Sequence, residues 1–252
     1  MKDITLISRD VHRHFFHQFV KFGANVLYPL YVSAPCTEQE LRDCEEDYAI
    51  AGFPGCIGST DATHIPLEKV CFLLRQAHLG GKSKNTTRTY NLTCNHRRQI
   101  LHTTTGNPGR WNDKTLVRFD SFMADLRDGA MNENMSFELR TRQGLTTASD
   151  EERAAGDKNE RTLKLKGAYV IVDNGYLEWS TTVPPVKNSC NRAELRFSQW
   201  LESMRKDVEC TFGILKGRLR ILKTGIRVHN TKVCDNIWLT CCALQHYWML
   251  TA

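Results

Sequence analysis

The chain lacks a long hydrophobic run: among its 252 residues, no apolar stretch approaches the roughly 20 residues needed to span a bilayer. Its first 30 residues mix polar and apolar side chains, so they do not form the hydrophobic region of a secretory signal. Hydrophobic residues make up 41% of the chain and charged residues 25%, values typical of a soluble globular protein. We therefore expect no membrane association, and one large domain or a domain with an appendage.

The ten cysteines include no CxxC pair, and zinc-finger spacing is absent. Because no segment directs the chain to an oxidising compartment, we interpret these cysteines as reduced and mostly buried. A structural zinc site built from Cys94 and His96 with distant partners is the alternative, although the spacing is poor for it.

The net charge of +6 is concentrated in residues 187–232, where eleven Lys or Arg face four acids. A basic segment of this kind suits a polyanionic partner, because binding to phosphates releases counterions. The simpler interpretation of the same charges is a solvated helix face.

The hydrophobic pattern predicts a mixed α/β domain. Helices are expected over 7–31, 37–48, 113–127, 191–216 and 233–250, and strands over 56–60, 89–94, 99–105, 165–172 and 181–186. In the first helix, Val11, Phe15, Phe19, Phe22 and Val26 share one face. Residues 128–162 hold few large apolar side chains, and they indicate an insertion or a partly disordered loop, in which Met135–Leu139 could form a short strand.

Three acids occupy distinctive places in this pattern. Asp61 and Asp173 each close a predicted strand, and Glu209 lies on the predicted helix over 191–216. Carboxylates at strand ends with one more on a facing helix can hold hard divalent cations for phosphodiester chemistry. Each acid alone has a local explanation, since acids after strands form turns or caps and Glu209 can pair with Arg205 at i,i+4.

Four sequence blocks set these acids in context: Phe53–Pro66 (FPGCIGSTDATHIP), Gly109–Asp113 (GRWND), Val172–Tyr176 (VDNGY) and Arg205–Ile221, which contains R-x-x-x-E-x-x-F-G-x-L-K-x-R. In this order they resemble the DDE superfamily endonuclease domain of PIF/Harbinger transposases, the family that includes Harbinger-derived nucleases. The resemblance covers roughly residues 50–245. Ala62 departs from the family's usual glycine, and Asn112 stands where the family often has histidine.

The resemblance implies an RNase H-like fold, with a mixed five-stranded sheet flanked by helices and a short helical N-terminal appendage. On this basis residues 51–252 form the endonuclease domain with an insertion at about 128–162, and residues 1–50 are a helical remnant of a DNA-binding region. It also implies that Asp61, Asp113, Asp173 and Glu209 bind Mg²⁺ or Mn²⁺, with Asp61, Asp173 and Glu209 as the catalytic acids. DNA is the expected partner, and in the family a Myb-like protein often supplies DNA recognition and nuclear entry.

Cations around the last block are the expected DNA contacts. These are Arg205, Lys216, Arg218 and Arg220, which cluster near Glu209 in the sequence. The leading hypothesis is a nuclear, metal-dependent DNA nuclease or transposase. A domesticated, non-enzymatic DNA- or protein-binding module on the same scaffold is the first alternative, and a metal-dependent phosphatase is a weaker one.

Overall fold

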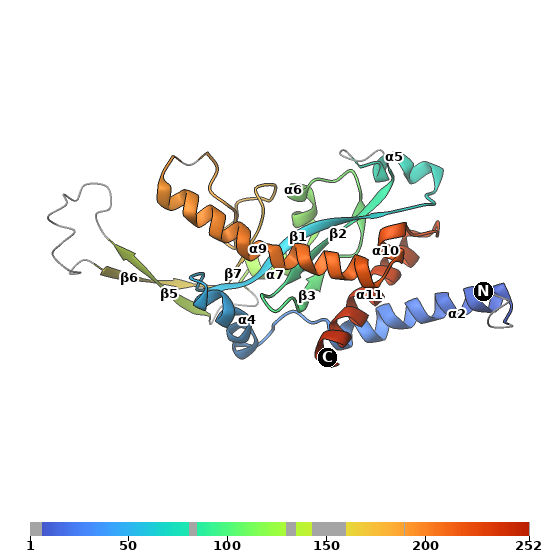
Figure 1. Cartoon of the computed structure of the whole chain (residues 1–252), viewed down its shortest axis with the longest axis horizontal. Helices are drawn as coiled ribbons and strands as arrows, with labels where there is room; N and C mark the ends of the chain where they lie inside the picture. Colours follow the sequence, from blue (N-terminus) through green and yellow to red (C-terminus); the bar gives the residue numbers. More distant parts are fainter. Residues whose placement is uncertain (1–6, 81–84, 130–134, 143–159, 189, 252) are drawn as a thin grey trace.

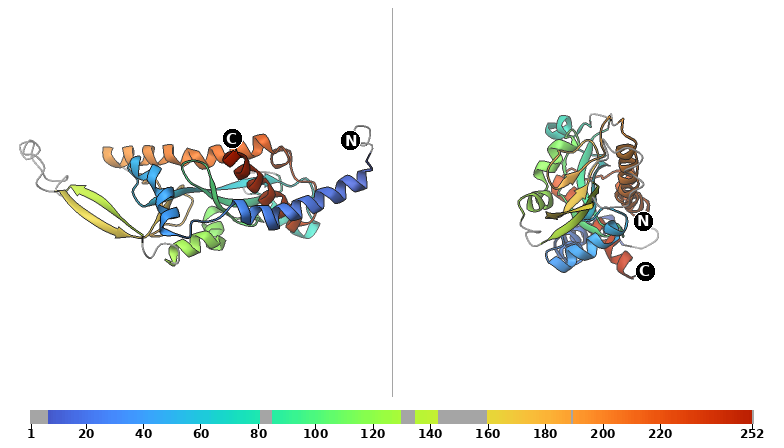
Figure 2. Two further views of the ribbon diagram at one scale, coloured as in Figure 1. Left: turned by 90° about the horizontal axis from the view of Figure 1, so that it is seen from below. Right: turned by 90° about the vertical axis from the view of Figure 1, so that its left-hand side faces the viewer.

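The computed structural model describes residues 7–80, 85–129, 135–142, 160–188 and 190–251. A mixed sheet forms its centre, with helices on both faces (Figures 1 and 2). The strands of this sheet are β1 (Cys56–Pro66), β2 (Thr87–Cys94), β3 (Ile100–Thr103), β4 (Asn107–Pro108), β7 (Tyr169–Ile171) and β8 (Thr182–Val183). The predicted mixed α/β class is confirmed.

The order of strands along the sheet is β3-β2-β1-β7-β8, and β4 pairs with β2 outside this path. β2 runs antiparallel to both β1 and β3, whereas β7 runs parallel to β1 and β8 parallel to β7. Three antiparallel strands followed by two parallel ones agree with the RNase H-like sheet that the resemblance implies, and β4 is a short addition to it.

The helices follow the predicted order with three differences. They are α2 (Arg9–Phe22), the π-helix η1 (Gly23–Leu27), α3 (Tyr28–Tyr31), α4 (Glu38–Ile50), the 3₁₀ turn η2 (Phe72–Leu74), α5 (Arg75–His78), α6 (Asp113–Leu116), the 3₁₀ turn η3 (Val117–Phe119), α7 (Ser121–Arg127), α9 (Arg192–Arg218), α10 (Ile221–Thr224) and α11 (Thr231–Thr251). The single helix predicted over 113–127 is wrong, because Asp120 leaves the helix and caps α7 with its carboxylate. The η2–α5 segment and α10 were not predicted.

Apolar side chains pack on both faces of the sheet, since successive strand residues point to opposite sides. On one face, Tyr90 of β2 stacks on Trp238 of α11, with ring centroids 4.6 Å apart. On the other face, Phe122 and Met123 of α7 pack against Ile57 of β1. Within the described part of the chain, no helix combines the length and apolar character that a membrane crossing needs.

The N-terminal helix α2 packs against the core with the side opposite to the apolar face that contains Val11 and Phe15. Val20 and Val32 belong to the core beside α11, and the Thr240 hydroxyl donates to the Val20 carbonyl at 3.0 Å. The helix predicted over 7–31 is confirmed, but Val11 and Phe15 of its apolar face are 56% and 67% exposed. The domain boundary at residue 50 stays a prediction.

The segment predicted as an insertion contains regular structure. β5 (Ser136–Arg142) and β6 (Glu160–Lys166) pair as an antiparallel two-stranded sheet, apart from the central one. The strand predicted over 165–172 is therefore wrong as one unit: Gly167, with φ 95°, turns the chain between β6 and β7. Residues 130–134 and 143–159, which belong to the same predicted insertion, lie outside the described residues.

Candidate metal-binding site

Asp61 lies within β1, so the prediction that it closes this strand is wrong: pairing with β2 extends the strand to Pro66. The Asp61 side chain is 22% exposed. Its Oδ1 accepts a hydrogen bond from the Ala62 backbone N–H at 2.8 Å, and its Oδ2 lies 3.6 Å from an Arg205 guanidinium nitrogen of α9. Arg205 is itself buried. The helix that carries Glu209 is thus linked to the strand that carries the first acid by an ion pair.

Asp113 and Asp173 approach each other around a glycine. Asp173 follows β7 and accepts a hydrogen bond from the Gly175 backbone N–H at 2.8 Å, while Asp113 is the first residue of α6. A β-carbon on Gly175 would lie 2.6 Å from Asp113 Oδ2 and 3.0 Å from Asp173 Oδ1. Both carboxylates therefore occupy the space that a side chain at position 175 would fill, which explains glycine there.

The charges of these three aspartates act on one another. The pKa of Asp61 is raised to about 6: burial is the largest cause, Arg205 and the Ala62 N–H lower it, and the neighbouring Asp173 and Asp113 raise it. Burial also raises the pKa of Tyr176 well above its usual range, and the charges of Asp61, Asp113 and Asp173 add to that rise. The structure thus brings Asp61, Asp113 and Asp173 close enough for their charges to interact, in one partly buried, negatively charged cluster.

Glu209 is placed differently from the three aspartates. It lies on α9 and is exposed to solvent. Arg205, one turn before it, contacts Asp61, and Lys216, two turns after it, donates from Nζ to the Thr63 hydroxyl at 2.7 Å. Because residues four apart share a helix face, Glu209 lies on α9 between the two residues that tie this helix to the Asp61–Thr63 stretch of β1.

A buried hydrogen-bond network lies next to the three aspartates. The Tyr176 hydroxyl donates to Asn91 Oδ1 at 2.5 Å, and Asn91 Nδ2 donates to Asp120 Oδ2 at 2.5 Å. Asn91 pairs with Ala62 across β1 and β2, so the network links the Asp173 turn to the strand beside Asp61.

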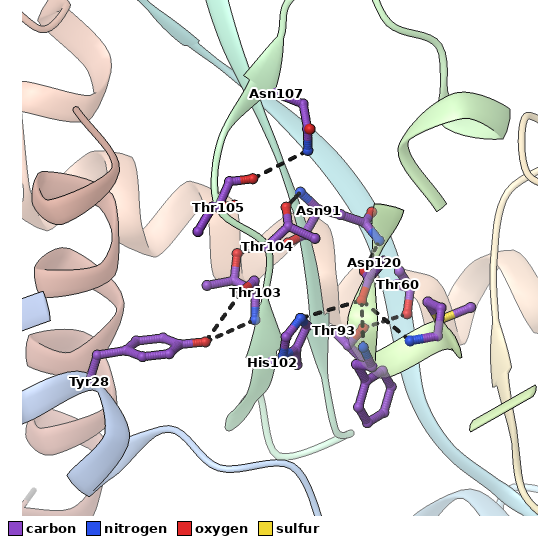
Figure 3. A network of polar contacts seen from close by, with 12 residues as sticks. Tyr28, Thr60, Asn91, Thr93, His102, Thr103, Thr104, Thr105, Asn107 and Asp120 are labelled. Atoms are coloured by element: carbon purple, nitrogen blue, oxygen red, sulfur yellow. Dashed lines mark hydrogen bonds and ion pairs between the residues drawn. The ribbon is translucent and has the colours of Figure 1, made fainter. Parts of the chain in front are cut away.

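Asp120 closes this network near α7, as Figure 3 shows. Its Oδ1 accepts hydrogen bonds from the Phe122 and Met123 backbone N–H groups at 3.0 and 3.3 Å, and lies 3.3 Å from His102 Nε2. The network was not predicted from the sequence. Its one available signal was Tyr176 in the VDNGY block, because a polar residue inside a fully buried strand, such as Asn91, carries no motif.

Two departures from the family pattern have local explanations. Ala62 pairs with Asn91 inside β1 and is not among the positive-φ residues, so its position does not require glycine. Asn112 caps α6, since its Oδ1 accepts hydrogen bonds from the Thr115 N–H and hydroxyl, both at 2.9 Å. Asn112 therefore orients the helix turn on which Asp113 lies.

The predicted DNA contacts are spread over the end of α9 and the residues after it. Lys216 is half-buried against β1, and burial lowers its pKa. Arg218 is exposed, donates to Gln245 Oε1 at 3.2 Å and lies over the Trp248 ring, and Arg220 is exposed before α10. With Arg205 on Asp61, these residues form a basic stretch leading away from the acids.

A divalent cation suits the three aspartates in its preference for oxygen ligands and in its charge. Three carboxylates, with one guanidinium beside them, leave negative charge uncompensated, and hard cations select carboxylate oxygens. Among the described residues, no group of three or more His, Cys, Asp or Glu side chains is arranged to hold an ion as it stands.

The two residues of the alternative zinc site, Cys94 and His96, each contact another side chain. Cys94 is buried with its Sγ 3.7 Å from the Thr211 hydroxyl, and His96 Nδ1 lies 2.6 Å from Asp207 Oδ2. All ten cysteines are free, and six of them are buried.

Comparison with known proteins adds one match. The model of the family described as DDE superfamily endonuclease matches residues 60–246, a range that includes all four acids. No curated protein and no solved structure gives a significant match.

Proposed function

The chain belongs to the DDE superfamily endonucleases, whose model covers most of its length, and from this we propose that it is a metal-dependent DNA endonuclease or transposase. The clustering of Asp61, Asp113 and Asp173, whose charges act on one another, is the observation that supports the proposal. We assign the PIF/Harbinger type from the four sequence blocks. Nuclear location and a Myb-like partner stay predictions.

In this proposal Asp61, Asp113, Asp173 and Glu209 hold Mg²⁺ or Mn²⁺. When bound, two such cations supply activation of a water or 3′-hydroxyl and stabilisation of the leaving oxygen. The protein's own part is to position the donors: β1, α6 and the turn after β7 present the aspartates, and α9 presents Glu209. Arg205 offsets the charge of Asp61 while no cation is present.

Plasmid cleavage tests the proposal. Purified protein should nick or linearise supercoiled DNA with Mn²⁺ or Mg²⁺, and Asp61→Asn or Glu209→Gln should abolish the activity. Asp125→Asn, an exposed acid on α7, is the matched control and should cleave like the wild type. Undiminished cleavage by both Asp61→Asn and Glu209→Gln would refute the proposed site.

The second candidate is a non-enzymatic DNA-binding module on the same fold. Its support is the Arg205–Asp61 ion pair, which places a fixed cation where a metal ion would act. It predicts DNA binding in EDTA that weakens steeply with salt, together with no cleavage under any metal. Binding that does not respond to ionic strength would contradict this candidate.

A further inference from the structure

Far along β1 from the acids, an apolar tip projects into solvent. It consists of Phe72 and Leu73 in the 3₁₀ turn η2, each 85% exposed. Single exposed apolar residues are ordinary on protein surfaces, but two adjacent large side chains at this exposure form a contiguous patch.

The base of this tip is firmly anchored. Leu67 bridges to Ile226 after α10, Leu79 bridges to Thr86, and the buried His78 donates from Nδ1 to the Thr87 carbonyl at 3.0 Å. Figure 1 shows α5, which continues from the tip, at the same end of the sheet as α10. A fixed base presents the two apolar side chains at a defined place, as an inserting element requires.

Cations flank the tip. Lys69 and Arg75 lie on either side of it in the chain, and with His229 they line a cleft of about 440 Å³ that also contains Glu68. An apolar tip between basic side chains matches the surface of a nucleic-acid duplex, where phosphates surround stacked bases. A purely apolar protein partner would leave these cations without complementary charge.

The base of the tip directly follows the strand that carries Asp61. From Asp61 the chain follows β1 past Thr63, where Lys216 is bound, to Leu67 at the base of the tip. Six extended residues span about 20 Å, or about six base-pair steps. DNA cut at the acids and lying along β1 would meet the tip roughly six to eight steps from the cut.

We infer that Phe72 and Leu73 form a wedge that enters the base stack of bound DNA, while Lys69 and Arg75 hold the adjacent phosphates. The inference rests on the proposed function, because it takes DNA as the ligand. Apolar wedges unstack base steps and kink the duplex, and bent DNA can contact more protein surface.

Fluorescence of 2-aminopurine in 30-base-pair duplexes tests the wedge without cleavage. The probe base is scanned along the duplex, and full-length protein is added in EDTA to saturation, monitored by fluorescence anisotropy of an end label. For wild-type protein we expect a rise of several-fold at one or two adjacent positions. Phe72→Ala combined with Leu73→Ala should remove that rise, while Ile50→Ala, an 82% exposed residue on α4, should keep it.

The outcomes separate this inference from the proposed function. Absence of any DNA binding by wild-type protein would end both. Saturated binding with no change of fluorescence at any position, or an equal rise in the double variant, would overturn the wedge and leave the nuclease proposal standing. A double variant that changes only the oligomeric state, measured by light scattering, would assign the tip to contacts between protein chains and also overturn the wedge.

Discussion

The three aspartates beside the sheet are partly buried, whereas the glutamate on α9 is exposed. The surroundings of Asp61 raise its pKa. Its strand pairs with the strand of Asn91, which belongs to the network with Tyr176 and Asp120. Glu209 is exposed on a helix whose neighbours, not its own side chain, contact the strand. The difference indicates that folding positions the aspartates of the proposed site before a ligand binds, whereas the Glu209 side chain is free to change its conformation when one binds.

Glu209→Gln gives the largest expected effect and separates function from stability. Because the side chain is exposed, the melting temperature should stay that of the wild type, while Mn²⁺-dependent cleavage should fall by more than about 100-fold. Glu202→Gln, also exposed on α9, is the control and should retain activity. Full activity in Glu209→Gln would remove this residue from the site.

Acid titration of the metal-free protein should show that Asp61 affects stability, whereas Glu209→Gln is expected to leave the melting temperature unchanged. The folded pKa of Asp61 is about 6, above the ordinary value of 3.8 for an aspartate, so the folded state binds the extra proton between pH 4 and 6. The free energy of unfolding should therefore fall as the pH rises through this window, by up to about 3 kcal/mol from this one group. Urea unfolding in EDTA measures it.

Asp61→Asn is the matched variant for that titration and should lose this part of the pH dependence. Identical pH profiles for the variant and the wild type would contradict the burial of a raised-pKa carboxyl at position 61.

The network beneath the aspartates should matter for stability first. Tyr176→Phe removes the donor to the buried Asn91 Oδ1, which should cost about 1–2 kcal/mol of unfolding free energy. It should also weaken Mn²⁺ binding, measured by calorimetry, because the Asp173 turn loses its tie to β2. Tyr247→Phe, on the exposed side of α11, should change neither quantity. Unchanged Mn²⁺ affinity in Tyr176→Phe would show that the network does not contribute to metal binding by the aspartates.

The smallest expected effect concerns Lys216 on the helix side. Lys216→Gln should lower the salt dependence of DNA binding by about one phosphate contact and weaken affinity only a few-fold. Filter binding at several salt concentrations provides the slope, with Lys164→Gln, exposed on β6 outside the basic segment, as a control. A slope identical to that of the wild type would show that Lys216 only ties α9 to β1.

Local sequence signals predicted most of the helices and strands, because the capping box at Thr37 and the apolar run before Asp173 act over a few residues. They failed where distant partners decide. The break at Asp120 reflects a carboxylate that caps α7 and meets Asn91, and the strand around Gly167 divides because β6 pairs with β5.

For the proposed site, the sequence motifs predicted four acids, and the structure places Asp61, Asp113 and Asp173 close enough for their charges to interact. The roles of Asn91 and Tyr176 could not be foreseen, because a buried polar contact depends on the register between β1 and β2. The exposed apolar face of α2 was missed for a related reason: periodicity shows that a stripe exists, but not whether it is covered.

Anomalous diffraction from crystals of the protein grown with Mn²⁺ tests the central claim most directly. We predict anomalous density at the aspartate cluster, with carboxylate oxygens of Asp61, Asp173 and Glu209 within about 2.5 Å of bound manganese. Manganese bound elsewhere on the protein, with Arg205 still paired to Asp61 and Glu209 turned to solvent, would contradict the claim.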